Sequence, residues 1–396
     1  MARVYILDAD RERREQLVTS LQRMLKAPDQ VERLKATLEG CPWPGSSWEF
    51  RTEMSTFDLR KFIEEWTGRN TFPIDILVIH IEPYDVRETW RDLWDALGKQ
   101  KNLPSGFCVL FWTDSGPDLD SFGKSIRQVQ RDFQLDAFTK RPFIWIFPSL
   151  GTDTLTPWLA HTLRFLWRAS CTYPKVMQRE QEVVKRGPGI IKHAVSVSVD
   201  LTAYRNIVSH HSAGDVARTV HQWLRMALCL AEVHLLEQLY GLPIVGTDYV
   251  TGVAEISDAN EEAQLHGWQR AIEGSLYVRC AMYEHERMLH VLLAKLALVD
   301  EVPANTVQIG ISPGSLFVGP AGIRGEFNYI GDGLDNSRSL CASDSNYRIL
   351  AHASCPAAKL KPEYMKVLGK DCFEKLMDGP SAPYYAVLDP SREIKI

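Results

Sequence analysis

The chain has 396 residues, of which 45% are hydrophobic and 24% charged, the composition of a globular protein long enough for two hydrophobic cores. Its formal net charge of −5 provides no basic surface, which argues against nucleic-acid binding. The start, MARVYILDAD, meets an acidic residue too early for a signal peptide, and continuous apolar stretches such as CVLFW are far too short for membrane insertion.

Apolar and amphipathic stretches alternate over the first part of the chain. RVYILDAD (3–10) is expected to be a buried strand that leads into a helix at 11–25, where Leu17, Leu21 and Leu25 are four residues apart. This alternation predicts an α/β domain with a doubly wound parallel sheet. Further strands are expected at 74–83, 107–114 and 142–149, with helices at 86–97 and 124–133 and an inserted loop at 28–48.

A helical segment is expected to follow this domain. The stretch 156–169 has helical periodicity, Pro174 is expected to end it, and 175–186 continues as a polar helix that could pair with a copy of itself. Gly187-Pro188-Gly189 marks the next boundary. The predicted organisation is a first domain at 1–155, linker helices at 156–190 and a second domain at 191–396.

The second domain opens with HAVSVSVD (193–200), whose alternating valines and serines predict a half-buried strand that ends on Asp200. Asp215 is a plausible N-cap for the long helix that follows. Two strands around a Thr-Asp-Tyr turn are expected at 242–256, and two strands joined by Ser312-Pro313-Gly314 at 306–323. FNYIGDGLDNSRSL (327–340) reads as a strand, a tight turn and the start of a helix.

Three stretches of this domain resemble the catalytic domain of class III nucleotidyl cyclases, over roughly residues 190–390. They are VSVDLTAY, the acidic hairpin tip GTDYV, and IGISPGSLFVGPAGI followed by NYIGDGL. The resemblance implies an α+β domain with a mainly antiparallel sheet, whose sites form at the interface of a head-to-tail dimer. A homodimer through this domain is therefore expected.

In that family, two carboxylates hold two metal ions that polarise a nucleoside triphosphate and lower the pKa of the attacking 3′-hydroxyl. Asp200 and Asp248 stand at the matching positions. The resemblance therefore implies Mg²⁺ or Mn²⁺ at these residues when nucleotide is bound. A second interpretation stays open, in which Asp200 caps the next helix and Asp248 serves the hairpin turn.

The nucleotide-recognising positions depart from the family pattern. The purine-recognising lysine falls on Ile244, and its partner falls on Asn328, whose amide could still bond a base edge. Counting from Gly331, the family's ribose- and phosphate-binding asparagine and arginine fall on Asp335 and Ser339. A carboxylate at Asp335 opposes the negative charge of a triphosphate.

Asn336 and Arg338 are the right residue types at the wrong spacing. Because they are two residues apart, a helix points them about 200° away from each other, so they cannot share one substrate, and Arg338 is expected to turn outward. Only a local distortion of the helix would make them catalytic residues. We therefore interpret the second domain as a degenerate cyclase domain.

The first domain resembles a response-regulator receiver over roughly residues 1–150. Asp8 and Asp10 match that family's acidic Mg²⁺ pocket, and Lys140 in DAFTKRPF matches its lysine. His80 stands at the phosphoacceptor position, where a neutral imidazole cannot form an acyl phosphate or hold Mg²⁺ as a carboxylate does. The resemblance implies a pseudo-receiver, in which His80 is a hydrogen-bonded histidine, a phosphorylated residue or a pH sensor.

Two functions fit these observations. The first is a bacterial-type regulatory protein without turnover, which acts by homodimerisation, by binding an unidentified signalling partner and by sensing nucleotide. The second is an active nucleotidyl cyclase, a phosphorus–oxygen lyase that uses ATP, GTP or a pyrimidine nucleotide with a divalent metal. Phosphorylation-gated response regulation is disfavoured by His80. The eight scattered cysteines form no C-x-x-C pair, which favours reduced thiols and a cytoplasmic location.

Overall fold

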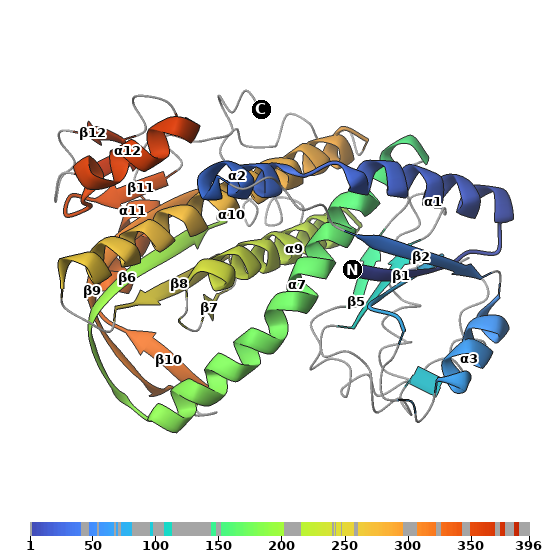
Figure 1. Cartoon of the computed structure of the whole chain (residues 1–396), viewed down its shortest axis with the longest axis horizontal. Helices are drawn as coiled ribbons and strands as arrows, with labels where there is room; N and C mark the ends of the chain where they lie inside the picture. Colours follow the sequence, from blue (N-terminus) through green and yellow to red (C-terminus); the bar gives the residue numbers. More distant parts are fainter. Residues whose placement is uncertain are drawn as a thin grey trace. The chain divides into compact units, whose positions relative to one another are not determined.

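A computed structural model describes most of the chain (Figure 1). The described residues are 2–40, 47–53, 55–66, 69, 73–80, 96–97, 107–112, 144–147, 152–201, 215–239, 241, 243–246, 248–256, 260–295, 307–321, 326–342, 349–368, 373–376 and 384–387. Lys140, the helix expected at 124–133 and most of the helix expected at 86–97 lie outside them.

The chain divides into two compact units. The first comprises Met1–Pro28, Pro44–Pro174 and Ala213–Asp215, and the second comprises Asp29–Trp43, Lys175–Ser212 and Val216–Ile396. Of the segment expected to link two domains, residues 156–174 therefore lie in the first unit and residues 175–190 in the second.

A five-stranded parallel sheet forms the centre of the first unit, in the order β2-β1-β3-β4-β5. Figure 1 labels its strands β1, β2 and β5. The expected parallel sheet is confirmed, and its central strand β3 is apolar because both faces are covered: Ile76, Leu77, Val78 and Ile79 are fully buried. The strands are β1 (Ala2–Leu7), β2 (Trp48–Glu53), β3 (Ile76–His80), β4 (Cys108–Trp112) and β5 (Ile144–Phe147), and the helices include α1 (Arg11–Lys26) and α3 (Thr56–Glu65).

The inserted loop expected at 28–48 is wrong, because helix α2 (Gln30–Glu39) lies there. Asp29 and Glu32 form a capping box in which each side chain accepts a hydrogen bond from the other residue's backbone N–H. Helix α2 belongs to the second unit. Its Lys35 forms a 2.5 Å ion pair with Glu237 of α9 (Asp215–Gln238) and lies over the ring of Tyr277 in α10 (Glu261–Lys295).

The break expected at Pro174 is also wrong, since α7 (Thr152–Arg186) runs on through both Pro157 and Pro174. The helix ends at the predicted boundary, because Gly187 follows its last residue. The φ of Gly187 is +77°, in the left-handed region, and its N–H donates to the Val183 carbonyl. Val183 is buried and packs into the second unit, which provides the tertiary contact that holds this last turn.

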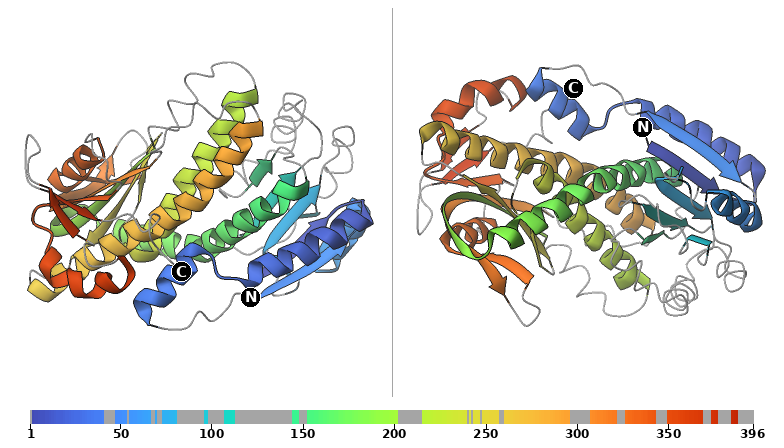
Figure 2. Two further views of the ribbon diagram at one scale, coloured as in Figure 1. Left: turned by 90° about the horizontal axis from the view of Figure 1, so that it is seen from above. Right: turned by 60° about the horizontal axis from the view of Figure 1, so that its bottom comes forward.

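The second unit is built on one large sheet with the strand order β12-β13-β11-β9-β6-β8-β7, to which β10 adds by pairing with β9. Every pairing is antiparallel except the one between β9 and β11, so the mainly antiparallel sheet is confirmed. Long helices α9 and α10 run side by side in both views of Figure 2. The strands are β6 (Gly189–Asp200), β7 (Ile244–Val245), β8 (Tyr249–Glu255), β9 (Gln308–Ala321), β10 (Glu326–Ile330), β11 (Ile349–His352), β12 (Phe373–Leu376) and β13 (Tyr384–Val387), and the remaining helices are α11 (Asp332–Cys341) and α12 (Ala357–Leu368).

Two strand predictions need correction. Strand β6 is not half-buried: residues 194–199 are all buried, because its serines face α11 instead of water. Ser198 shares hydrogen bonds with Thr251 (3.0 Å) and with Ser337 of α11 (2.7 Å). Strand β9 is continuous through Ser312-Pro313-Gly314, whose residues pair with Ser196, Val195 and Ala194 of β6, and the register shifts only beyond Ala194. The proline is tolerated in this interior strand, and no turn forms there.

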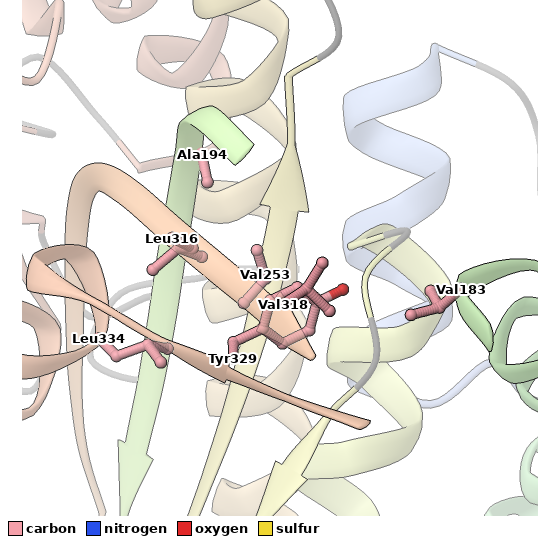
Figure 3. Packing of buried hydrophobic residues seen from close by; sticks show 7 residues of the cluster. All are labelled: Val183, Ala194, Val253, Leu316, Val318, Tyr329 and Leu334. Carbon is pink, nitrogen blue, oxygen red and sulfur yellow. The ribbon is translucent and has the colours of Figure 1, made fainter. Parts of the chain in front are cut away.

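Strands β6, β9 and β10 extend beyond β8 as a three-stranded arm with two different faces. One face carries an apolar cluster, in which side chains from six elements pack together (Figure 3). The members are Val183, Ala194, Val253, Leu316, Val318, Tyr329 and Leu334. The other face exposes Ile190, Phe317 and Ile330, which are direct cross-strand partners and are 73%, 45% and 63% exposed. We call these three residues the apolar row.

Among the described helices, none combines the length and the hydropathy that crossing a bilayer requires.

Candidate functional site

The two candidate metal ligands lie at adjacent strand ends. Asp200 is the last residue of β6 and pairs with Tyr249 of β8, and the N–H of Leu201 donates to the Asp248 carbonyl at 2.7 Å. Asp248 is buried at the tip between β7 and β8, and Asp200 is partly exposed. The antiparallel register therefore places the backbones of two aspartates side by side, although they are 48 residues apart in sequence.

This donor pair fits a hard divalent cation. Carboxylate oxygens are the ligands that Mg²⁺ and Mn²⁺ prefer, and Mg²⁺ commonly takes only one or two of them and completes its shell with phosphate and water. Within the described part of the chain, no group of three His, Cys, Asp or Glu residues could hold a metal ion by itself. A cation at Asp200 and Asp248 would therefore depend on a substrate phosphate for further ligands.

Arg338 does not turn outward, contrary to expectation. Its guanidinium carbon lies 4.4 Å from the ring centroid of Tyr249, the cross-strand partner of Asp200, and the side chain is half-buried. Burial raises the pKa of the Cys341 thiol on the same helix, the negative charge of Asp200 raises it further, and the positive charge of Arg338 lowers it. A cation stacked on an aromatic ring thus lies at the acidic end of the sheet.

The phase of α11 explains this position. Leu334, Ser337 and Cys341 face the sheet and are buried, and the Cys341 thiol donates to the Ser198 carbonyl. Arg338 is next to this buried stripe and can reach the hairpin, whereas Asn336 lies on the opposite flank and is exposed. The structure therefore does not bring Asn336 and Arg338 together.

The positions that match the family's ribose and phosphate ligands both face solvent. Asp335 is exposed, and the Ser339 hydroxyl donates back to the Asp335 carbonyl at 2.8 Å. The helix starts at Gly331, which has a φ of +152° and lies so close to the Ser315 carbonyl oxygen that a Cβ would overlap it. Only glycine permits this turn, and the turn determines which side chains of α11 face the sheet.

The two positions expected to recognise a base, Ile244 of β7 and Asn328 of β10, lie in different surroundings. Ile244 packs against the apolar cluster, as Phe327 does. Asn328 alternates with Phe327 and Tyr329 along β10, so it lies on the opposite face, and its side-chain oxygen accepts from the Tyr329 N–H at 2.8 Å. The structure therefore does not place these two residues around one base.

A polar triad of residues from α7, β8 and β10 was not predicted from sequence. Glu255 accepts hydrogen bonds from both terminal nitrogens of Arg186 (2.7 and 3.1 Å) and from the Tyr329 hydroxyl (2.6 Å). Burial alone would raise the pKa of Glu255, but these hydrogen bonds outweigh it and hold the pKa below the ordinary value. The triad ties the end of α7 to β8 and β10.

In the first unit, the candidate receiver residues gather at the carboxyl ends of the strands. Asp8 follows β1 and His80 ends β3, and His80 Nδ1 lies 3.9 Å from Asp8 Oδ1. Asp10 is used differently: it is exposed, and its carboxylate caps α1 by accepting from the Arg13 N–H, which lowers its pKa. Arg13, which sequence reasoning missed, contacts both Asp8 and His80.

Comparisons with known proteins give structural neighbours for half of the chain. No family model and no curated protein sequence matches. The adenylyl cyclase CyaB from P. aeruginosa matches with 17% identity and a TM-score of 0.33, over 51% of this chain and 96% of its own. The guanylyl cyclase domain of the RhoGC fusion protein from Blastocladiella emersonii, described as a non-canonical dimer, matches with 13% identity and a TM-score of 0.33, over 51% and 98%.

A third neighbour is a class III adenylyl cyclase-like ATP-binding protein from Pseudomonas aeruginosa, with 13% identity, a TM-score of 0.31, and coverage of 50% of this chain and 39% of its own. About half of this chain thus has class III adenylyl and guanylyl cyclases as its structural neighbours.

Proposed function

We propose that this chain is a regulatory signalling protein, in which a receiver-like unit is fused to a degenerate class III cyclase-like unit. The second unit would bind a nucleoside triphosphate with Mg²⁺ or Mn²⁺ and report its presence through self-association and a protein partner, without making a cyclic product. The observation that most supports the absence of turnover is the arrangement of side chains on α11. Asp335 and Ser339 face solvent, and Asn336 and Arg338 lie on opposite sides of the helix.

Binding without turnover is supported by the charges at the acidic end of the sheet. Asp200 and Asp248 suit a divalent cation, and Arg338 beside them suits a phosphate group, because a guanidinium is always charged and offers several donors. Within the described helix α11, Asn336 is exposed on the other flank, so this helix offers no second donor opposite Arg338 to stabilise charge that develops at the phosphorus. An exposed carboxylate at Asp335 cannot supply it.

An active nucleotidyl cyclase is the second candidate, and the position of Arg338 favours it. The half-buried guanidinium lies on the acidic side of α11, where a phosphorus-binding group would be useful. In this alternative, Arg338 alone takes over the charge stabilisation that the family divides between two residues.

A nucleotide assay separates the two candidates. We expect Mg²⁺ with ATP or GTP to raise the melting temperature of the protein by a few degrees, because a ligand that binds only the folded state stabilises it, and we expect no cyclic nucleotide. Asp200→Asn and Arg338→Met should each abolish the shift, whereas Glu262→Gln, an exposed carboxyl at the start of α10, should not. Differential scanning fluorimetry and chromatography of the nucleotides measure both quantities.

Cyclic product that disappears in Asp200→Asn would establish the enzyme instead. A protein that gives neither a shift nor a product would contradict nucleotide sensing and leave only the interaction role.

Self-association is supported by the apolar row of Ile190, Phe317 and Ile330. Its side chains stand in register on three strands and remain largely exposed, although a well-folded sheet normally covers such a face. We commit to a second copy of this chain as its partner, because a row of this kind can stack on the same row of another copy about a two-fold axis.

Phe317→Lys should therefore weaken the homodimer at least about 100-fold, since it places a charge in the centre of an apolar contact. Val245→Lys is the matched control, because Val245 is an apolar strand residue of similar exposure (48%) that lies outside the row. Sedimentation velocity over a range of concentrations measures the change. A dimer of unchanged affinity in Phe317→Lys, or a wild-type protein that stays monomeric, would remove this part of the proposal.

A further inference from the structure

The acidic pocket of the first unit contains a cation that belongs to the chain itself. Arg13, in the first turn of α1, donates from Nε to Asp8 Oδ2 at 2.8 Å and from Nη2 to Asp8 Oδ1 at 2.7 Å. This is the two-pronged geometry in which a guanidinium binds a carboxylate most strongly. The Asp8 side chain is fully buried, so its negative charge requires such a partner.

The same guanidinium reaches the phosphoacceptor position. Nη2 of Arg13 lies 3.0 Å from Nδ1 of His80, whose side chain is 3% exposed. An arginine can only donate, so His80 Nδ1 accepts this hydrogen bond, and the ring carries its hydrogen on Nε2. The lone pair of Nδ1 is thereby engaged by Arg13 and is not open to phosphorylation.

An aromatic side chain completes the surroundings of the guanidinium. Trp112, the partner of His80 in the pairing of β3 with β4, is buried, and its ring lies 5.3 Å from the guanidinium carbon of Arg13. The imidazole of His80 packs against the same ring, with 4.3 Å between the ring centroids. Arg13 therefore joins the ends of β1, β3 and β4 to the start of α1.

These contacts do not fit a divalent cation. Both oxygens of Asp8 are occupied by the guanidinium, Asp10 is turned to the helix cap, and a second cation beside Arg13 would be repelled. Among the described residues, the pocket that the receiver resemblance assigns to Mg²⁺ thus offers no carboxylate pair for the ion, and Arg13 already supplies the positive charge.

We propose that Arg13 is the resident cation of this pocket and takes the place of the divalent metal. The ends of the three strands are then held in one arrangement by the protein alone, and the first unit responds neither to Mg²⁺ nor to small phosphoryl donors. This inference deepens the receiver-like part of the proposed function and rests on it only for the comparison with a metal-binding pocket.

The test uses the full chain with Asp200→Asn and Asp248→Asn as the parent, so that the second unit's carboxylates do not contribute a metal response. We expect millimolar Mg²⁺ or Mn²⁺ to leave the melting temperature of the parent unchanged, and acetyl phosphate with Mg²⁺ to add no phosphoryl mass. Arg13→Met removes the resident cation but keeps an apolar stem. It should lower the melting temperature by roughly 6 °C or more and make it rise again by about 3 °C with Mg²⁺.

Arg11→Met is the matched control, because Arg11 lies on the same helix and its exposed guanidinium pairs with Glu15 outside the pocket. It should change neither the melting temperature nor the metal response. A metal-dependent shift in the parent that Asp8→Asn abolishes, or an Arg13→Met protein that folds and ignores Mg²⁺, would overturn the proposal. If Arg13→Met does not fold, the parent's response to metal and its comparison with Asp8→Asn still decide the question. Because nucleotide is absent, a failure here leaves the proposed function of the second unit untouched.

Discussion

Gly310→Ala should lower the melting temperature of the protein by about 6 to 12 °C, the largest effect that we expect from the addition of one methyl group. Gly310 is in β9 under helix α11, where a Cβ would overlap the Ser337 carbonyl oxygen and lie 2.9 Å from the Leu340 Cβ and 3.1 Å from the Cys341 nitrogen. Two of these three neighbours are backbone atoms, which cannot move aside unless the helix moves.

The same substitution should also abolish the nucleotide-dependent shift, because a displaced α11 carries Arg338 away from Tyr249. Gly189→Ala is the matched control: Gly189 is a strand glycine of the same sheet, and a Cβ there would meet no atom within 4 Å. Thermal unfolding of both variants measures the difference. Equal melting temperatures would show that α11 does not pack on β9 as closely as described.

Glu232→Gln should stabilise the protein at pH 8 by about 3 kcal/mol and have little effect at pH 5. Burial in α9 raises the pKa of Glu232 from an ordinary 4.5 to about 7. Between these two values, the folded protein holds a proton that the unfolded chain has lost. The stability that this proton provides is therefore fully present below about pH 4.5 and is lost as the pH rises through about 7.

Urea unfolding at several pH values measures this effect as the difference between variant and wild type, which cancels the contribution of other titrating groups. A glutamine at position 232 stays neutral, so the variant's advantage should grow between pH 5 and pH 8. Glu262→Gln, whose carboxyl is exposed, should give a difference that does not change with pH. A constant difference for Glu232→Gln would contradict a raised pKa.

The positions of most strands were predictable because they depend on local patterns. Continuous apolar stretches gave β3, β4 and β5, and acidic residues after strands gave Asp8 and Asp200 at the strand ends. Helix α2 also had a local signal, since Asp29 and Glu32 form a capping box and Gly40 ends the helix in the left-handed region. The proline-rich stretch that follows obscured it.

Other features depended on distant contacts. Pro174 is inside a helix whose later turns belong to the second unit, where the buried Val183 packs into the apolar cluster. The alternating serines of β6 suggested that one face of this strand is exposed to solvent. Helix α11 covers that face instead, and its Ser337 is a hydrogen-bond partner of Ser198. A period of two shows that a strand has two faces and does not reveal what covers each of them.

The sequence by itself determined which chemical groups stand at the positions that the two resemblances point to: a histidine at position 80, and an aspartate and a serine at positions 335 and 339. Only the tertiary structure decided what the remaining charged groups do. Arg13 binds Asp8 in the pocket of the first unit, and Arg338 stacks on Tyr249 beside Asp200. A long flexible arginine side chain binds a buried carboxylate or an aromatic ring that lies within its reach. Which carboxylate or ring is nearest is fixed by the register of strands and the phase of helices, and spacing along the chain does not contain that information.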